Sequence, residues 1–340
     1  MNYKLLGRSG LRVSDLSLGT MTFGTEWGWG CDKEVAKQIF DCYANAGGNF
    51  IDTANRYTEG TSEKFVGEFI KSDRDHFVLA TKYSLFDRKG DPNFSGNHRK
   101  NMMRSVEESL KRLDTDHIDL LWVHAWDGTT PIEEMMRGLN DLVTSGKVHY
   151  IGISDTPAWV VAQANTMADW RGWNPFVALQ VEYSLIQRTP ERDLLPMAKA
   201  LDLAITPWAP LAGGALSGKY LRGEKGRVPE NSTRINERSQ KITKVVVDIA
   251  DELGVSPSQV ALNWCIQKNQ VVVPIIGAKT LVQIEDSLAC LNFKISDEHI
   301  ARLNEVSKIE IGFPHDFLAS DGVKEVLTGG TFSKIHNHRK

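Results

Sequence analysis

The amino-acid sequence predicts a (β/α)8 TIM barrel with an N-terminal β-hairpin and long loops at its C-terminal face. Short β-branched or apolar runs recur along the chain, and a stretch of helical periodicity follows each, which is typical of βα units around a parallel sheet. Eight parallel strands close into a barrel more readily than they form an open sheet. The eight predicted strands end near Leu18, Asp52, Thr81, Val123, Ile153, Val181, Thr206 and Ile276.

A doubly wound open sheet is the competing fold. It holds nicotinamide cofactors with a G-x-G-x-x-G turn after a strand. No such motif follows any predicted strand. A nicotinamide cofactor, if this chain binds one, is therefore held in another way.

The first predicted elements are a hairpin and a helix. The hairpin joins Tyr3–Leu6 to Leu11–Val13 through the turn Gly7-Arg8-Ser9-Gly10. The first helix is expected to open at Asp32 and to end at Gly47 and Gly48.

Further helices carry proline and glycine signals. Pro131 suits the first turn of a helix over Ile132–Ser145, which Gly146 stops. Between the seventh and eighth strands the gap is much longer than the others, and the glycine-rich, charged stretch Gly213–Arg238 looks like an inserted loop.

Two helices should follow the inserted loop, Lys241–Leu253 and Ser256–Lys268, with Ser256 and Pro257 as N-cap and first residue of the second. After a helix over Asp297–Lys308 the chain loses periodicity. We therefore expect a single domain over residues 1–340, with a core of about 15–310 and an irregular, glycine-rich and basic tail over 311–340.

Composition limits the classes of partner. Hydrophobic residues make up 41% of the chain and the formal net charge is -3, which argues against binding DNA, RNA or an anionic membrane and favours a small-molecule partner. No apolar run reaches about 18 residues, and the N-terminus lacks the pattern of a signal peptide. We expect a cytoplasmic protein. Its four cysteines should be reduced thiols, because they form no C-x-x-C pair.

Ionisable residues stand at the ends of the second, third and fourth predicted strands. In a barrel the chemistry lies at this C-terminal face. Each residue alone has a plain structural interpretation: Asp52 as a helix N-cap, Lys82 as a surface residue, His124 as a satisfied core histidine. Together with Tyr57, in the loop after Asp52, they complement each other in one reaction.

That reaction is hydride transfer to a carbonyl group. An unperturbed tyrosine, with a pKa of about 10, is too weak an acid at neutral pH, and we expect the Lys82 ammonium to lower the pKa of Tyr57. Asp52 would hold the lysine in place, while His124 would donate a hydrogen bond to the substrate oxygen. The set offers neither metal ligands nor a nucleophile with a paired base, so no metal site is predicted.

The motif Asp52-Thr-Ala-x-x-Tyr57, with Lys82 and His124, resembles the catalytic tetrad of the aldo-keto reductase superfamily. The resemblance runs from Gly19 to about Leu291. Within the superfamily, the chain is similar to bacterial members of the potassium-channel β-subunit-like branch. It implies a (β/α)8 barrel that reduces aldehydes and ketones with NADPH, with Tyr57 as the general acid. The channel β subunits carry asparagine in place of His124, so this chain is expected to be an active enzyme.

The resemblance also implies a cofactor site. Ser154 and Gln180 would bind the nicotinamide amide, Trp208 would stack on the ring, and a cation at Lys279 or Arg234 would favour the 2′-phosphate of NADPH. The residues implied are Thr20, Met21, Asp52, Ser154, Gln180, Trp208, Pro210, Leu211, Ala212, Gly214, Ser217, Lys219, Arg234, Gly277, Lys279, Gln283 and Asp286.

Three positions depart from the family pattern. Asp155 and Ser287 stand where asparagine is common, and Asp286 stands where glutamate is commoner. At these positions the expected cofactor contacts differ from those of the family, whereas the tetrad is intact.

Tryptophans in the predicted loops indicate an aromatic substrate pocket. Trp27, Trp29 and Trp126 should line it, so carbonyl substrates with aromatic or alkyl groups are expected. Packing of a loop against the barrel is the alternative role for these rings. Two other functions stay open: an NADPH-binding redox sensor with little turnover, and a barrel lyase or isomerase without nicotinamide. Whether the chain forms a homo-oligomer is also open.

Overall fold

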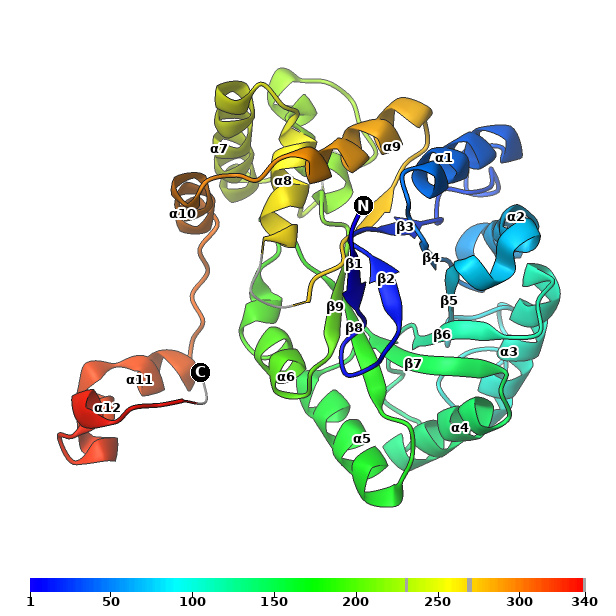
Figure 1. The fold of residues 1–340 in the computed structure, drawn as a ribbon, viewed down its shortest axis with the longest axis horizontal. Helices are drawn as coiled ribbons and strands as arrows, with labels where there is room; N and C mark the ends of the chain where they lie inside the picture. Colours follow the sequence, from blue (N-terminus) through cyan, green and yellow to red (C-terminus); the bar gives the residue numbers. More distant parts are fainter. Residues whose placement is uncertain (230–231, 268–270, 339–340) are drawn as a thin grey trace.

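Eight parallel strands form a ring with helices around it in the computed structural model, which describes residues 1–229, 232–267 and 271–338 (Figure 1). The barrel strands are β3 (Ser17–Gly19), β4 (Phe50–Asp52), β5 (Val78–Tyr83), β6 (Ile118–Val123), β7 (Val148–Ser154), β8 (Phe176–Glu182), β9 (Ala204–Trp208) and β10 (Ile275–Gly277). All eight predicted strands, and the barrel itself, are confirmed.

The strands pair in the order β10-β3-β4-β5-β6-β7-β8-β9, every neighbour parallel. The ring closes just before β10, where Ile205 of β9 accepts a 2.8 Å hydrogen bond from Val273 N and donates one of 2.8 Å to Val271 O. Strand ends that are consecutive in the chain therefore lie side by side in space.

The helices are α1 (Lys33–Asn45), α2 (Thr61–Ile70), α3 (Arg99–Leu113), α4 (Ile132–Thr144), α5 (Ala158–Arg171), α6 (Leu194–Ala200), α7 (Glu237–Leu253), α8 (Pro257–Ile266), α9 (Leu281–Leu288), α10 (Asp297–Val306), α11 (His315–Ala319) and α12 (Asp321–Thr328). Two apolar clusters fill the space between strands and helices, one under α3–α8 and one under α1, α2 and α9. Across the described residues, no helix is both long and apolar enough to cross a membrane.

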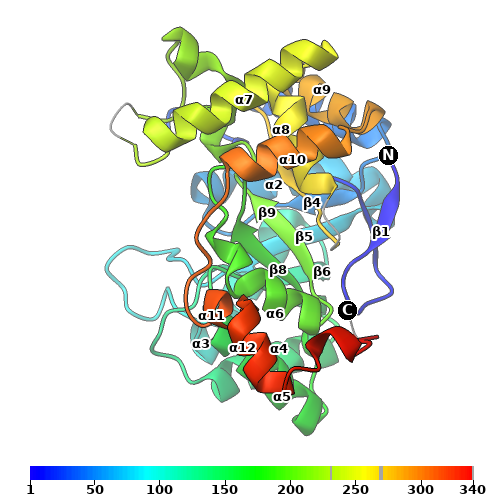
Figure 2. The same ribbon diagram turned by 90° about the vertical axis from the view of Figure 1, so that its left-hand side faces the viewer.

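The predicted N-terminal hairpin is confirmed as β1 (Tyr3–Leu5) and β2 (Arg12–Ser14), which pair antiparallel. Leu6 and Val13 are fully buried in the same cluster as Trp122 of the barrel interior. Gly7 is needed at the turn, since its φ is +55° and a Cβ there would lie 2.2 Å from Val177 O. Figure 2 shows the hairpin on one side of the barrel and the longest loops on the other.

Several predicted helix boundaries are wrong. The helix expected at Lys241 begins at Glu237, because Asn236 and Ser239 form a reciprocal capping box. Pro131 lies at the N-cap of α4 rather than in its first turn. The helix after Asp297 ends at Val306, two residues before Lys308.

The predicted loop between the seventh and eighth strands also contains local structure. Two 3-10 helices, Ala212–Ser217 and Lys219–Arg222, form its first part, and the first of them begins one residue before the predicted loop. The following helix α8 has Ser256 as its N-cap, as expected, and ends at Ile266. The predicted end at Lys268 falls outside the described residues.

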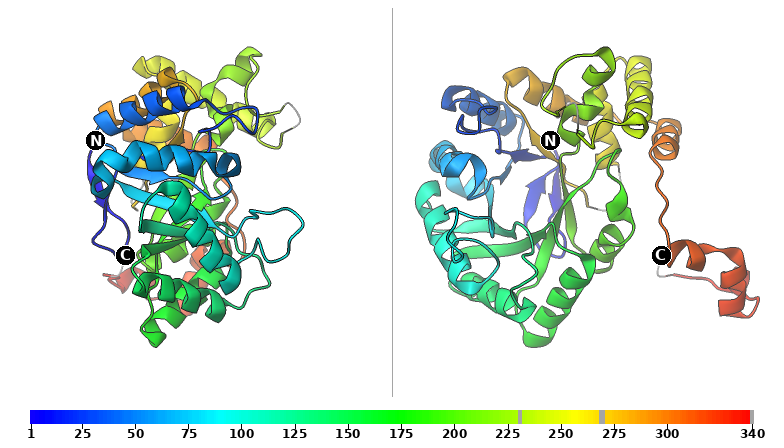
Figure 3. Two further views of the ribbon diagram at one scale, coloured as in Figure 1. Left: turned by 90° about the vertical axis from the view of Figure 1, so that its right-hand side faces the viewer. Right: turned by 180° about the vertical axis from the view of Figure 1, so that it is seen from behind.

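The prediction of an irregular tail is also wrong. Residues 315–328 form α11 and α12, which stand apart from the barrel (Figure 3, right). Neither helix has a buried residue, and α11, with five residues, is too short to show a helical period in the sequence. Large apolar side chains of the tail, among them Phe313 (85% exposed) and Val326 (83% exposed), face solvent.

Candidate active site

Three of the predicted catalytic residues lie at the carboxyl ends of adjacent strands. Asp52 is the last residue of β4, Lys82 is the penultimate residue of β5, and His124 directly follows β6. Because β4, β5 and β6 are neighbours in the ring, the strands bring these side chains to one end of the barrel.

Lys82 and Asp52 form a buried ion pair. Lys82 is fully buried, and its Nζ donates hydrogen bonds to Asp52 Oδ2 and, at 2.9 Å, to Thr53 O. Burial acts to lower the pKa of Lys82, but the Asp52 carboxylate and the Tyr57 phenol raise it above its ordinary value. Lys82 is therefore a charged residue of the barrel interior, and the surface interpretation is wrong.

The second oxygen of Asp52 is also bonded. Gln180 of β8 donates a hydrogen bond from Nε2 to Asp52 Oδ1 at 2.9 Å. The carboxylate is 2% exposed and fixed by a cation on one oxygen and an amide on the other. Asp52 and Gln180 thus hold the Lys82 ammonium in a single position.

Tyr57 lies directly over this pair. The Lys82 Nζ is 4.7 Å from the centroid of the Tyr57 ring. The tyrosine opens a tight turn in which Thr58 and Glu59 both have positive φ, 45° and 55°. The Thr58 hydroxyl donates to Phe23 O at 2.6 Å and accepts from Ser62 N at 3.1 Å.

The Thr58 hydrogen bonds hold a backbone conformation that a threonine rarely adopts. Sequence reasoning missed the part that Thr58 plays in placing Tyr57, because no local pattern indicates a positive φ at a β-branched residue.

The predicted direction of the Tyr57 pKa shift is wrong. Burial raises the pKa of the Tyr57 phenol above its ordinary value, and the nearby Lys82 charge offsets only part of that rise. The sequence indicated the cation but not the extent of burial, which disfavours the charged tyrosinate. Tyr57 therefore carries its proton at neutral pH.

His124 is neutral and partly unsatisfied. Burial, together with the charge of Lys82, holds the pKa of the imidazole well below its ordinary value. The His124 ring lies edge-on to the Tyr57 ring, with centroids 6.0 Å apart. Its Nδ1 is buried and has no hydrogen-bond partner among the described residues, so the interpretation as a satisfied core histidine is wrong.

A second buried polar atom without a partner lies at the end of the next strand, β7. Ser154 ends β7, is 1% exposed, and its hydroxyl finds no acceptor or donor within the described part of the chain. It pairs in register with Gln180. The next residue, Asp155, accepts a 3.0 Å hydrogen bond from the indole nitrogen of Trp208, which fixes that ring at the end of β9.

Some predicted cofactor residues already have partners. Arg234 pairs with Glu182 at 2.6 Å, and the Ser217 hydroxyl donates to Gly214 O at 2.7 Å. Thr20 is fully buried, and its hydroxyl donates to the backbone oxygen of Asp52 at 3.1 Å.

The predicted adenosine end lies around the start of α9. Lys279 is exposed, and its backbone N–H donates to Gln283 Oε1 at 2.9 Å. Asp286 accepts from Ser256 at 3.0 Å and from Gln259 at 2.7 Å, which ties α9 to the first turn of α8. The other predicted cofactor residues lie after β3, after β9 or at the end of β10: Met21, Pro210, Leu211, Ala212, Lys219, Gly214 and Gly277.

Of the three tryptophans predicted to line a substrate pocket, Trp27 lies beside Tyr57 and Trp29 lies beside Trp27. The Trp27 ring lies 6.5 Å from that of Tyr57 and 5.6 Å from that of Trp29. Trp126 packs edge-on against Trp159 at 5.5 Å, and its buried indole nitrogen has no partner among the described residues.

Comparison with known proteins identifies the family. The Aldo/keto reductase family model matches residues 15–308. The chain belongs to the aldo/keto reductase family. It is therefore an oxidoreductase, and the alternative of a barrel lyase or isomerase is excluded.

The relatives of this aldo/keto reductase include several fungal enzymes. It is 40% identical to an "Aryl-alcohol dehydrogenase [NADP(+)]" of Phanerodontia chrysosporium over 336 residues, 92% of this chain and 87% of the relative. It is 40% identical to norsolorinic acid reductase stcV of Emericella nidulans, over 91% of this chain and 82% of the relative. It is 39% identical to norsolorinic acid reductase B of Dothistroma septosporum, over 97% of this chain and 88% of the relative.

Proposed function

We propose that this aldo/keto reductase reduces aromatic aldehydes or ketones to alcohols, with Tyr57 as the proton donor. The observation that carries the proposal is the protonated Tyr57 phenol above the buried Lys82–Asp52 pair. The relatives named for aryl alcohols and for norsolorinic acid support an aromatic substrate. A cytoplasmic location and a place in the potassium-channel β-subunit-like branch remain predictions from the sequence.

The cofactor is NADPH, which supplies the hydride when bound. Ser154 fits it, because a buried hydroxyl without a partner suits the polar carboxamide of the nicotinamide. Gln180 would complete that contact and Trp208, oriented by Asp155, would flank the ring. At the phosphate end, Lys219 and Lys279 would supply cations, whereas Arg234 must first exchange its Glu182 partner for a phosphate.

Tyr57 can release its proton because a cation lies beneath its ring. A buried tyrosinate alone is unfavourable, but the Lys82 ammonium stabilises it when the proton passes to the substrate oxygen. Asp52 keeps Lys82 charged and in place. Lys82 and Asp52 therefore act through Tyr57 as positioning residues.

His124 would orient the substrate. Its imidazole is neutral, so it can donate an N–H to the carbonyl oxygen without competing as a proton donor. With its ring edge-on to Tyr57, His124 would hold that oxygen beside the phenol.

The reductive kcat/KM is expected to stay flat from about pH 6 to pH 9. The pKa of His124 is well below its ordinary value of 6.5, so the imidazole stays neutral throughout this pH range. The pKa of Tyr57 is raised above its ordinary value of 10.0, so the phenol also keeps its proton throughout the range. A pH profile measured with NADPH and 4-nitrobenzaldehyde checks this. An inflection close to pH 6.5 would show that His124 titrates normally and would contradict the assignment.

A cation that the sequence did not indicate lies beside the tryptophans. The guanidinium of Arg227, in the loop before α7, is 3.9 Å from the centroid of the Trp29 ring. A positive charge beside the predicted substrate-pocket tryptophans should favour substrates that carry a carboxylate. Because Arg227 is exposed, the effect should be modest and should weaken with salt.

Arg227→Gln is expected to lower kcat/KM for 4-carboxybenzaldehyde by about two- to fivefold and to leave that for benzaldehyde unchanged. Comparison of the two substrates at low and high ionic strength checks it. Arg222→Gln, which removes a cation paired with Glu224 in the same loop, is the matched control. An equal loss for both aldehydes would mean that Arg227 supports the loop rather than the substrate.

The proposal as a whole is tested by turnover. Wild-type protein should oxidise NADPH when 4-nitrobenzaldehyde or another aryl aldehyde is added. Binding of NADPH, seen as quenching of tryptophan fluorescence, with no turnover across an aldehyde panel would instead support the redox sensor.

A further inference from the structure

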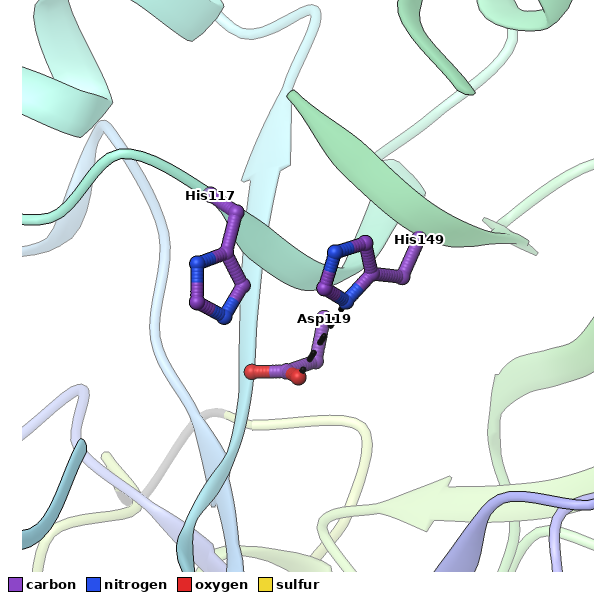
Figure 4. A group of neighbouring side chains, drawn as sticks. All are labelled: His117, Asp119 and His149. Atoms are coloured by element: carbon purple, nitrogen blue, oxygen red, sulfur yellow. Dashed lines mark ion pairs between the residues drawn. The ribbon is translucent and has the colours of Figure 1, made fainter. Parts of the chain in front are cut away.

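A group of potential metal ligands lies at the end of the barrel opposite Tyr57. His117 directly precedes β6, Asp119 is the second residue of β6, and His149 is the second residue of β7. The two strands are parallel neighbours that begin side by side, with Ile118 paired to Val148. Figure 4 shows both imidazoles lying above the Asp119 carboxylate.

The donor atoms of the three side chains converge, and the contact between His149 and Asp119 is a long ion pair (Figure 4). The imidazole rings are stacked with centroids 4.6 Å apart, and His149 Nδ1 lies 3.7 Å from Asp119 Oδ1, beyond hydrogen-bond distance. One ligand atom from each residue lies within 4.8 Å of the other two.

Neighbouring groups occupy the other atoms of two of these ligands. On Asp119, Oδ2 accepts from Arg74 at 2.7 Å and from Leu79 N at 2.9 Å, which leaves Oδ1 toward the histidines. On His117, Nδ1 bonds to Asp116 at 2.7 Å, which leaves Nε2 as the ligand atom. Protein metal sites orient their histidines and carboxylates with such outer partners.

We propose that His117, Asp119 and His149 bind one divalent transition-metal ion of the zinc or nickel type, with water completing its coordination. Two imidazoles and one carboxylate suit these ions, whereas Mg²⁺ prefers oxygen ligands alone. The side chains of His117 and Asp119 are 20% and 15% exposed and that of His149 is 46% exposed, so an ion can enter from solvent.

Binding would draw the ligands together. Zinc bonds to nitrogen and oxygen at about 2.0–2.2 Å, so donors up to 4.8 Å apart must move inward. His149 is exposed and can turn toward the other two. An ion held here would tie β6 to β7, and it would stabilise the fold rather than take part in catalysis at the opposite face.

Zinc titration of the untagged full-length chain by calorimetry tests the proposal. Because the exposed His336 and His338 in the tail offer a competing site, all proteins carry the changes His336→Ala and His338→Ala. The parent protein should bind one equivalent of Zn²⁺. Affinity should fall at least about tenfold in His117→Ala and in His149→Ala, while Mg²⁺ should give no binding at these residues.

His76→Ala is the matched control, because it removes an exposed imidazole just before β5, at the same end of the barrel. It should leave Zn²⁺ affinity unchanged. Saturating Zn²⁺ should raise the Tm of the parent but not of His149→Ala, with NADPH-dependent activity unaffected in both. Equal Zn²⁺ affinity in the parent, His117→Ala and His149→Ala would overturn the proposal.

Discussion

Lys82→Met is expected to destabilise the protein by about 3–5 kcal/mol and to remove most of its carbonyl reductase activity. Lys82 is fully buried and Asp52 is 2% exposed, so the substitution leaves a carboxylate in the barrel interior without its cation. It also removes the charge that stabilises the Tyr57 tyrosinate. Urea unfolding gives the loss of stability, and NADPH oxidation by the folded protein gives the loss of activity.

A double variant separates these two effects. Asp52→Asn together with Lys82→Met removes both charges, so it should be more stable than Lys82→Met alone while it stays nearly inactive. Lys71→Met is the control, since the Lys71–Asp114 pair is 68% exposed on both sides and its loss should change the stability little. If Lys82→Met were as stable as the wild type, the account of a buried, charged lysine would be wrong.

The barrel was predictable because its strands carry a strong local signal. Runs such as Ile118–Val123 and Val148–Ser154 are mostly apolar and mostly buried, and each barrel strand lies where such a run occurs. Boundaries set by a reciprocal cap, as at Asn236 and Ser239, were less visible, because a serine at the third helical position gives a weaker signal than glutamate or glutamine.

The grouping of the candidate catalytic residues was predictable from the sequence, but their pKa shifts were not. Asp52, Lys82 and His124 stand out as ionisable groups at the ends of apolar strands. The raised pKa of Tyr57 depends on how deeply the ring is enclosed, and burial is a property of the folded chain rather than of the motif.

The ligand group at the other end of the barrel is likewise hidden in the sequence. His117 and Asp119 have no motif spacing to His149, and only the parallel pairing of β6 with β7 brings them together. That the whole chain forms one domain, and whether it assembles into an oligomer, remain predictions from the sequence.

Tyr57→Phe removes one hydroxyl and should lower kcat by about a hundred- to ten-thousand-fold. The phenylalanine keeps the ring above Lys82 and beside Trp27, so the packing and the affinity for NADPH should change little. Tyr3→Phe, which removes an exposed hydroxyl from the N-terminal hairpin, is the control and should leave kcat unchanged.

The most direct measurement is the single-turnover rate of NADPH oxidation by 4-nitrobenzaldehyde in wild-type and Tyr57→Phe protein, each saturated with cofactor. We expect a fast wild-type reaction and a rate lower by at least about a hundredfold in Tyr57→Phe, with equal quenching of tryptophan fluorescence by NADPH. Equal single-turnover rates in the two proteins would show that Tyr57 is not the proton donor.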